Sequence, residues 1–380
     1  MKLRWIPLVV AFMLPMLVML PLTAAADIGD KATKLLLNDF NGTILDFDAS
    51  RILWKADNKV LWLYNRTNGA QVKVVDRTGA ADNVSQAKLS AQGVVYNLKD
   101  PKLPKLNSVY SWKNGQASRI ATGEDLYDIR GNGKVALLSQ HTVDLTTGQI
   151  GEFGFNRIEI APDGTMIYTA PVAPVGALAL FQTRPDGTVM RLAEPSNKVA
   201  SLSGAPYGYY GPVTDGKSIL YTESVESDHY RNHVFALRLR NADETVTTLS
   251  VGGSYQPNFS YRINNGWIAY IEFDRVKRTK YVNIRSPEGV VKRVFESPHW
   301  WSWANAPLTI DDLGPDGTVA FTSFDKTYLS YPKEDKPVSI HRSPAKFQYR
   351  EHVFGGPGGS PIRGGVWYLI NGGSLYAVRI

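Results

Sequence analysis

The chain has 380 residues, with 42 Lys and Arg against 35 Asp and Glu, 43% hydrophobic residues and no cysteine. An apolar fraction of this size is typical of globular proteins and excludes a disordered, collagen-like or coiled-coil chain. Without cysteine the chain has no disulfide framework, no thiol nucleophile and no cysteine-ligated zinc site.

The segment 1–26 has the pattern of a secretory signal peptide. Two basic residues precede an apolar stretch over 5–22, and the small residues 23–26 supply a cleavage site that leaves a mature chain starting at Asp27. The apolar stretch is long enough that an uncleaved membrane anchor is the competing interpretation. Its three prolines break the helix that an anchor needs and favour cleavage. The predicted organisation is therefore a signal peptide, 1–26, and one domain, 27–380.

Export without cysteine predicts a secreted or envelope-associated bacterial protein, because secreted eukaryotic domains more often use disulfides. After cleavage the chain has 40 bases (42 less two) and 35 acids, a formal charge of +5. The longest basic cluster, 275–280, is interpreted as a solvated hairpin tip. Such mild and dispersed charge does not predict nucleic-acid binding, and no membrane span is expected after cleavage.

From residue 27 onward, short runs of β-branched and aromatic residues bounded by Gly, Pro, Asn or Asp predict strands and no amphipathic helix. The strongest repeated unit is a strand, a Pro-Asp-Gly turn and a second strand that ends in an aromatic residue. It occurs at Arg157–Tyr168 and Leu313–Phe321, with looser copies at Thr214–Tyr221 and Asn265–Tyr270. Pro presets φ in such a turn, Asp hydrogen-bonds its own backbone, and Gly takes the positive φ that follows.

Taking the second strand of each unit as an anchor gives eight positions: Trp54, Tyr96, Leu138, Tyr168, Tyr221, Tyr270, Phe321 and Tyr368. Their spacing, with four short strands per unit, is that of β-propeller blades. We therefore predict an all-β fold, a single β-propeller of eight blades. The interval from Leu138 to Tyr168 is the shortest of the series and leaves seven blades as the alternative.

The two chain ends predict how the ring closes. Residues 34–38 form a lone strand without a blade, whereas the C-terminal segment supplies only three strands, at 351–354, 365–370 and 375–380. We expect the N-terminal strand to complete the last blade and to remove the exposed edges that an open ring would have.

The Pro-Asp-Gly units at Pro162–Tyr168 and Pro315–Phe321 resemble the WD40-like repeats of TolB-type propellers, in which such a turn joins the two inner strands. The resemblance is sharp in two blades and loose in the others. It implies a propeller fold and an exported location. The α/β domain that precedes the TolB propeller has no counterpart between Asp27 and the first blade, so the Tol–Pal role does not carry over.

Aromatic residues recur in the predicted connections between blades. Tyr207, Tyr255, Trp301 and Tyr349 follow one another at nearly equal intervals, in step with the blades. Such rings stack on sugars or anchor a protein partner, although wedge-shaped core packing between blades is the competing interpretation. Adjacent residues of a strand face opposite sides, so Trp300 and Trp301 cannot both be buried on one side.

These connections give the predicted ligand-binding residues. The stacking contacts are Trp300, Trp301, Trp303, Tyr209 and Tyr255. Their polar neighbours are Glu226 and Asp228, in the long segment after Tyr221. That segment also holds His229 and His233, separated by one helical turn in sequence, but no helical pattern surrounds them and a hydrated loop is preferred to a metal site.

Carboxylates on the predicted innermost strands suggest an alternative chemistry. They are Asp46, Asp48, Asp128, Glu159, Asp311 and Asp312. They are interpreted as the polar lining of a water-filled channel, but they could hold a hard cation such as calcium or act as the paired acids of a glycosidase. For an enzyme, the candidate acids are Asp48, Asp311 and Asp312.

No G-x-S-x-G elbow, P-loop or dinucleotide-binding glycine motif is present in the sequence. No catalytic residue, cofactor or metal is therefore predicted. The leading hypothesis is a non-catalytic exported protein that recognises an envelope glycan or a protein partner through an aromatic-rimmed propeller face. A carbohydrate-active enzyme that uses the channel carboxylates and a structural envelope scaffold are the alternatives.

Overall fold

The computed structural model describes residues 33–37, 42–48, 50–99, 102, 107–131, 133–152, 157–161, 163–172, 177–194, 209–227, 233–253, 260–274, 277, 279–297, 308–323, 326–341, 362–363, 366–371 and 374–379. Their regular secondary structure consists of β-strands. No helix in these ranges is long and apolar enough to cross a membrane. The predicted signal peptide, 1–26, lies outside the described residues.

Seven sheets are each built from four consecutive antiparallel strands. The first contains β2 (Thr43–Phe47), β3 (Arg51–Ala56), β4 (Val60–Asn65) and β5 (Gln71–Asp76). The second contains β6 (Asn83–Leu89), β7 (Val94–Lys99), β8 (Asn107–Lys113) and β9 (Gln116–Thr122). The third contains β10 (Leu126–Arg130), β11 (Val135–Leu138), β12 (His141–Asp144) and β13 (Ile150–Glu152). The fourth contains β14 (Arg157–Ile160), β15 (Met166–Val172), β16 (Ala177–Thr183) and β17 (Val189–Ala193).

The next three sheets repeat the pattern. The fifth contains β18 (Tyr209–Thr214), β19 (Ile219–Ser227), β20 (His233–Arg240) and β21 (Val246–Gly253). The sixth contains β22 (Tyr261–Asn264), β23 (Trp267–Asp274), β24 (Thr279–Arg285) and β25 (Val291–Glu296). The seventh contains β26 (Leu308–Leu313), β27 (Val319–Ser323), β28 (Lys326–Ser330) and β29 (Val338–His341).

The eighth sheet joins the two ends of the chain. Its order is β1 (Thr33–Leu37), β32 (Ser374–Arg379), β31 (Val366–Asn371) and β30 (Ile362–Arg363). β1 pairs antiparallel with β32, with Thr33 opposite Val378 and Leu35 opposite Tyr376. The predicted closure by an N-terminal strand is therefore confirmed. The innermost strand of this sheet is β30, whereas the sequence pattern predicts a strand at 351–354, which lies outside the described residues.

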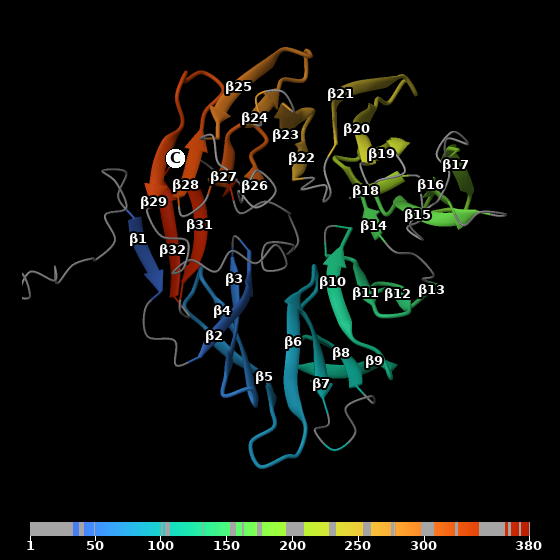
Figure 1. The fold of residues 1–380 in the computed structure, drawn as a ribbon. Coiled ribbons are helices and arrows are strands. Elements are labelled where there is room, and N and C mark those ends of the chain that lie inside the picture. The colour runs from blue at the N-terminus through green and yellow to red at the C-terminus, as the bar shows by residue number, and fades with distance from the viewer. Residues whose placement is uncertain are drawn as a thin grey trace, which may run out of the picture.

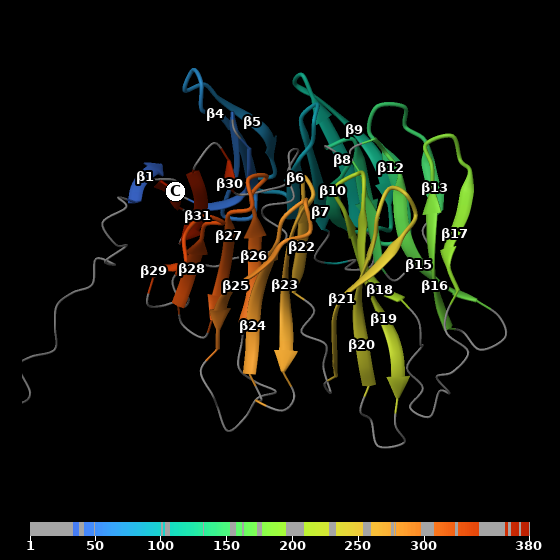
Figure 2. The ribbon, with the colours of Figure 1, turned by 90° about the horizontal axis from the view of Figure 1, so that it is seen from above.

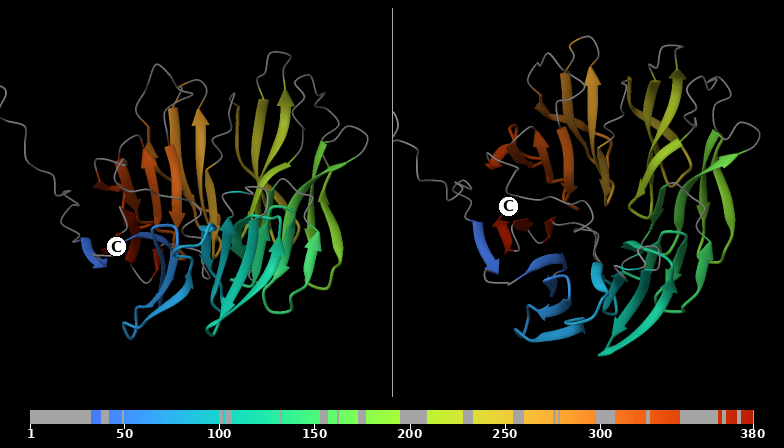
Figure 3. Two further views of the ribbon diagram at one scale, coloured as in Figure 1. Left: turned by 90° about the horizontal axis from the view of Figure 1, so that it is seen from below. Right: turned by 60° about the horizontal axis from the view of Figure 1, so that its bottom comes forward.

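The sheets follow one another around a central axis in chain order (Figure 1). The first strands of neighbouring sheets contact each other, as β14 does with β18 and β22 with β26. The strands of successive sheets run between the same two ends of the molecule (Figure 2), and the ring is seen obliquely in Figure 3. This arrangement is the predicted β-propeller. All eight sequence anchors lie in the second strand of a sheet.

The short interval between Leu138 and Tyr168 has a simple cause. The third sheet is made of short strands: β11 and β12 have four residues each and β13 has three. The third sheet therefore has four strands but contains fewer residues than the neighbouring sheets.

In four of the sheets, the aromatic anchor of the second strand stacks on the aromatic residue directly opposite it in the third strand. Trp54 in β3 faces Trp62 in β4 with ring centroids 5.9 Å apart, and Tyr96 faces Tyr110 at 5.5 Å. The same pairing recurs as Tyr168 on Phe181 at 5.6 Å and Phe321 on Tyr328 at 5.2 Å. Each such pair contributes about 0.5–1.5 kcal/mol beyond the area that it buries. In these four sheets the aromatic residue that ends the repeat is thus a packing residue.

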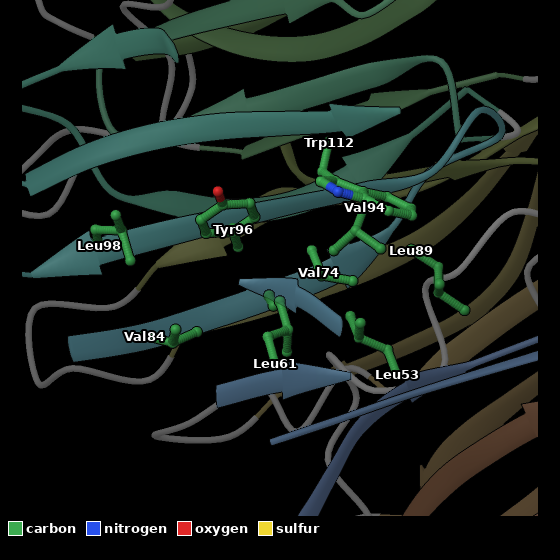
Figure 4. Packing of buried hydrophobic residues seen from close by; sticks show 10 residues of the cluster. Leu53, Leu61, Val74, Val84, Leu89, Val94, Tyr96, Leu98 and Trp112 are labelled. Carbon is green, nitrogen blue, oxygen red and sulfur yellow. The ribbon is translucent and has the colours of Figure 1, made fainter. Parts of the chain in front are cut away.

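Apolar side chains fill the space between neighbouring sheets. Leu53 and Leu61 of the first sheet pack with Val84, Val94 and Tyr96 of the second (Figure 4). Similar clusters join the second sheet to the third and the sixth to the seventh. Since each sheet buries one face against each neighbour, the sheets stabilise one another as one cooperative unit.

The Pro-Asp-Gly turns have the predicted geometry. Asp316 accepts hydrogen bonds from the backbone N–H and the hydroxyl of Thr318, both at 3.1 Å, and Gly317 has a φ of +85°. A Cβ at Gly317 would lie 2.5 Å from the indole of Trp267 in the preceding sheet. This turn therefore needs glycine both for its backbone conformation and for its packing.

We predict that removal of β1 destabilises the whole ring. A chain that begins at residue 39 should have a lower melting temperature than one that begins at residue 32, and it should self-associate, because the edge of β32 is then unpaired. Thermal unfolding followed by circular dichroism, with light scattering, measures both effects. Equal melting temperatures for the two chains would show that β1 does not close the ring.

Candidate functional site

The three longest connections between described strands join strand ends at the same end of the ring. In each antiparallel sheet the connection from the second to the third strand opens at the same end as the connection to the next sheet. Between sheets, the segment 194–208 links β17 to β18, 297–307 links β25 to β26 and 342–361 links β29 to β30. The connections at the opposite end are all shorter than these three. We call the first end the loop-bearing end.

The structure describes the predicted ligand-binding residues only in part. Trp300, Trp301, Trp303, Tyr255 and Asp228 lie outside the described residues. Tyr209 is the first residue of β18, where its backbone pairs with Glu223, and Glu226 pairs with Val234 near the end of β19. The backbone of both residues is therefore at the loop-bearing end, although Tyr209 belongs to a strand and not to the connection in which the sequence pattern places it.

Charged residues occupy one register position of the innermost strands. In each sheet this position pairs with the residue that precedes the anchor of the second strand. It is charged in six of the eight sheets, and we call these residues the inner charged ring: Asp46, Lys88, Asp128, Glu159, Arg262 and Asp312. Val213 and Ile362 occupy the position in the other two sheets.

Hydrogen bonds and ion pairs link the ring from one sheet to the next. Asp46 is fully buried and accepts hydrogen bonds at 2.8 Å from the backbone N–H of Phe47 and of Leu89, the latter in the second sheet. Lys88 lies 3.6 Å from Asp128 in the third sheet, and its buried ammonium group has no hydrogen-bond partner among the described residues. Burial raises the pKa of Asp46 to about 7, although Lys88 opposes the shift.

Arg130 extends the chain of charges to the fourth sheet. Its guanidinium lies 3.0 Å from Asp128 and 3.5 Å from Glu159. Burial raises the pKa of Glu159 above its ordinary value, although the attraction of Arg130 opposes this shift. Four consecutive sheets are thus joined electrostatically at their inner edges.

Asp311 lies beside the ring, at a β-bulge between Ile310 and Asp312. Its carboxylate accepts hydrogen bonds from the hydroxyls of Thr309 at 3.2 Å and Thr322 at 2.6 Å. Burial nevertheless raises the pKa of Asp311 to about 7. A carboxyl group in this state can transfer a proton near neutral pH, which is the requirement for a general acid.

Asp48 has a structural role in a turn. Its carboxylate accepts the backbone N–H of Ser50 at 2.8 Å and of Arg51 at 2.7 Å, and it forms an ion pair with the Arg51 guanidinium at 2.6 Å. Burial acts to raise the pKa of Asp48, but the hydrogen bonds and charge of Arg51 lower it below its ordinary value. Asp48 is therefore unsuited to the role of general acid that the enzyme hypothesis gives it.

A polar cluster at the loop-bearing end has no signal in the sequence. Glu124, before β10, accepts backbone N–H groups at the start of β12 and lies 2.8 Å from the ring nitrogen of His141. Asp125 accepts the side-chain amides of Asn97 at 3.1 Å and Asn107 at 2.5 Å. These partners are far apart in the sequence, so only the fold brings them together.

The described residues contain no group of three or more His, Cys, Asp or Glu side chains that could hold a metal ion. His229, which the sequence pattern pairs with His233, lies outside them. The inner charged ring and Asp311 can order water, hold protons at Asp46 and Asp311, and attract a charged or hydrogen-bonding group. Asp128 and Glu159 of the ring form ion pairs with Lys88 and Arg130.

The architecture defines the class of protein: a β-propeller of four-stranded sheets closed by its N-terminal strand. Neither a protein-family model nor a curated protein matches the sequence. Among solved structures, oligogalacturonate lyase from Vibrio parahaemolyticus is 11% identical, with a TM-score of 0.43 over 93% of this chain and 92% of that one. The propeller domain of the Trilobed protease from Pyrococcus furiosus, which has an open velcro topology, is 13% identical with a TM-score of 0.43 over 79% and 98%.

A third similar structure is the propeller domain of Cps50 (Swd1) from Myceliophteria thermophila, 10% identical with a TM-score of 0.39 over 90% and 98% of the two chains. At this level the similarities say nothing about function. The eight sheets themselves define the fold.

Two raised pKa values predict a pH effect on stability. Asp46 and Asp311 ionise near 3.8 when unfolded and near 7 when folded, so the folded chain binds more protons between these values. Their contribution is complete below the unfolded pKa and is lost as the pH rises through about 7. Asp46→Asn and Asp311→Asn should each reduce the fall in melting temperature between about pH 5 and about pH 8.

The charged neighbours of these groups are Lys88 and Asp128 around Asp46, and Arg262 and Asp312 around Asp311. Asp186→Asn is the control, because Asp186 lies in an exposed turn where the Thr188 backbone N–H lowers its pKa. If all three variants keep the pH dependence of the wild type, the two buried carboxyls do not hold their protons in the fold.

Proposed function

We propose that this protein is an exported, non-catalytic binding protein that recognises an envelope glycan or a protein partner at the loop-bearing end. The observation that carries the proposal is the unequal length of the connections at the two ends of the ring. Long connections vary freely while a rigid sheet holds their ends, and for this reason binding residues concentrate on them.

The composition of these connections supports the same proposal. Trp300, Trp301 and Trp303 belong to the connection 297–307 between β25 and β26, and Tyr255 belongs to the one before β22. Aromatic rings with a polar edge are suited to stacking on sugars and to anchoring a protein partner. Glu226, near the end of β19, and Asp228, between β19 and β20, supply hydrogen-bond acceptors to the proposed site.

The proposal also includes that the protein is exported and that its repeats are related to those of TolB-type propellers. These two inferences are supported by the signal pattern of 1–26 and by the two Pro-Asp-Gly repeats. A bacterial envelope or extracellular location follows from the signal pattern and the absence of cysteine.

A carbohydrate-active enzyme is the second candidate, since the raised pKa of Asp311 is a property of general acids. Against it, Asp311 and Asp312 are both buried, and Asp311 is held by two threonine hydroxyls. Buried carboxyls with such partners contribute to the packing of the inner strands, so the binding role is preferred.

Recognition can be tested with residues 27–380 and a panel of cell-wall and plant oligosaccharides, followed by tryptophan emission. We expect saturable binding that Trp301→Ala weakens by about tenfold or more, the loss of one aromatic anchor. Trp62→Phe, which keeps the ring stack inside the first sheet, should bind as the wild type does. Unchanged affinity in Trp301→Ala would remove Trp301 from the site, and no response to any glycan would favour a protein partner.

The double variant Asp311→Asn, Asp312→Asn separates binding from catalysis. If the protein is a binder, the variant should retain nearly full affinity for any ligand that the panel identifies, because both carboxyls lie on the innermost strand β26 and are buried. Product analysis by chromatography after incubation with that ligand measures turnover. Turnover by the wild type that the double variant lacks would establish the enzyme instead.

A further inference from the structure

The fourth strand of each of the first seven sheets is an edge whose outer side pairs with no other described strand. Such edges invite pairing with other chains unless charge, a bulge or short length prevents it. A bulge recurs in the outer strands β5, β9, β17, β21, β25 and β29. In four of these six strands a cation directly precedes the bulged residue: Lys73, Arg119, Arg191 and Arg293.

β21 departs from this pattern. It has the sequence VTTLSVGG, is the longest of the outermost strands with eight residues, and contains no charged residue. Thr248 occupies the position of the cation and accepts a hydrogen bond from the guanidinium of Arg238 in β20, whose charge is paired with Glu223 at 2.8 Å. Val246 and Val251 are 49% and 58% exposed near the two ends of the strand. β21 therefore has no charged side chain of its own, although it keeps the bulge, at Leu249.

We propose that β21 pairs antiparallel with β21 of a second copy and so forms a two-fold symmetric dimer. A two-fold axis between Thr248 and Leu249 places Val246 of each copy opposite Val251 of the other, and Thr247 opposite Ser250. β-Branched apolar pairs and hydroxyl pairs stabilise facing strands. A strand that meets its own copy needs a self-complementary surface, and this one has it.

Charge and length explain why a second copy meets this edge and no other. Self-pairing of β5, β9, β17 or β25 about an axis at the cation would bring the cations of two copies together, and like charges on facing strands are destabilising. The remaining outer strands, β13 and β29, have only three and four residues, and short edges offer little to pair with. β21 is long and has no charged residue, and the Arg238 guanidinium at Thr248 is paired with Glu223. The main-chain donors and acceptors at its edge gain partners when the copies meet.

The molar mass in solution tests the proposal. Sedimentation and light scattering over a range of concentrations should show residues 27–380 in equilibrium between the monomer and a species of twice its mass. Val251→Lys should remain monomeric at the same concentrations, because it replaces both Val246–Val251 pairs across the axis with an ammonium group that faces a valine. Val189→Lys is the matched control, since Val189 is 59% exposed on the edge strand β17, and it should dimerise as the wild type does. Circular dichroism confirms that both variants fold.

Cross-linking tests the register directly, because the chain has no cysteine of its own. A mixture of Val246→Cys and Val251→Cys chains should form disulfide-linked dimers faster than either variant alone under the same oxidising conditions. A wild type that stays monomeric at every concentration would overturn the proposal, even if the edge binds a strand from another protein. Dimers that persist in Val251→Lys, or cross-linking no faster in the mixture, would also overturn it.

Discussion

The pairing of β1 with β32 is the constraint on which the rest of the molecule depends. It places a segment near the start of the chain and the end of the chain in one sheet, so that the last sheet has four strands like the other seven. A ring closed in this way holds its innermost strands at fixed positions. Fixed inner strands bring the residues of the inner charged ring next to one another, as Lys88 and Asp128 are.

The kind of side chain changes from the innermost strand of each sheet to the outermost. Charged residues on the first strands link neighbouring sheets around the axis, as Lys88 does with Asp128. Aromatic stacks and aliphatic clusters fill the middle of the sheets, where water is excluded. The outer strands mostly carry cations and bulges that discourage pairing with other chains, whereas the long β21 has the bulge but no charged residue.

Much of this fold could be predicted from local sequence. The aromatic residue at the end of each repeat and the Pro-Asp-Gly turn depend on neighbours close in the chain, so Tyr168 and Phe321 marked their strands reliably. The innermost strand of the last sheet could not be located, since β30 has only two residues and no pattern of its own. The sequence analysis named the four acids of the inner charged ring but not its bases, Lys88 and Arg262. The common register could not be predicted, because bulges shift some first strands and Asp46 and Asp312 are equivalent only once the strands are paired. The pair of Glu124 and His141 could not be predicted either, because the fold brings the connection before β10 next to the start of β12.

Amide hydrogen exchange measured by mass spectrometry tests the central claim, closure of the ring by the N-terminal strand, most directly. The account predicts that peptides covering β1 and β32 are both protected, and that β1 loses its protection only when the whole ring unfolds. Rapid exchange throughout β1, with β32 still protected, would contradict it. In that case the ring would be held together without a strand from the N-terminal segment.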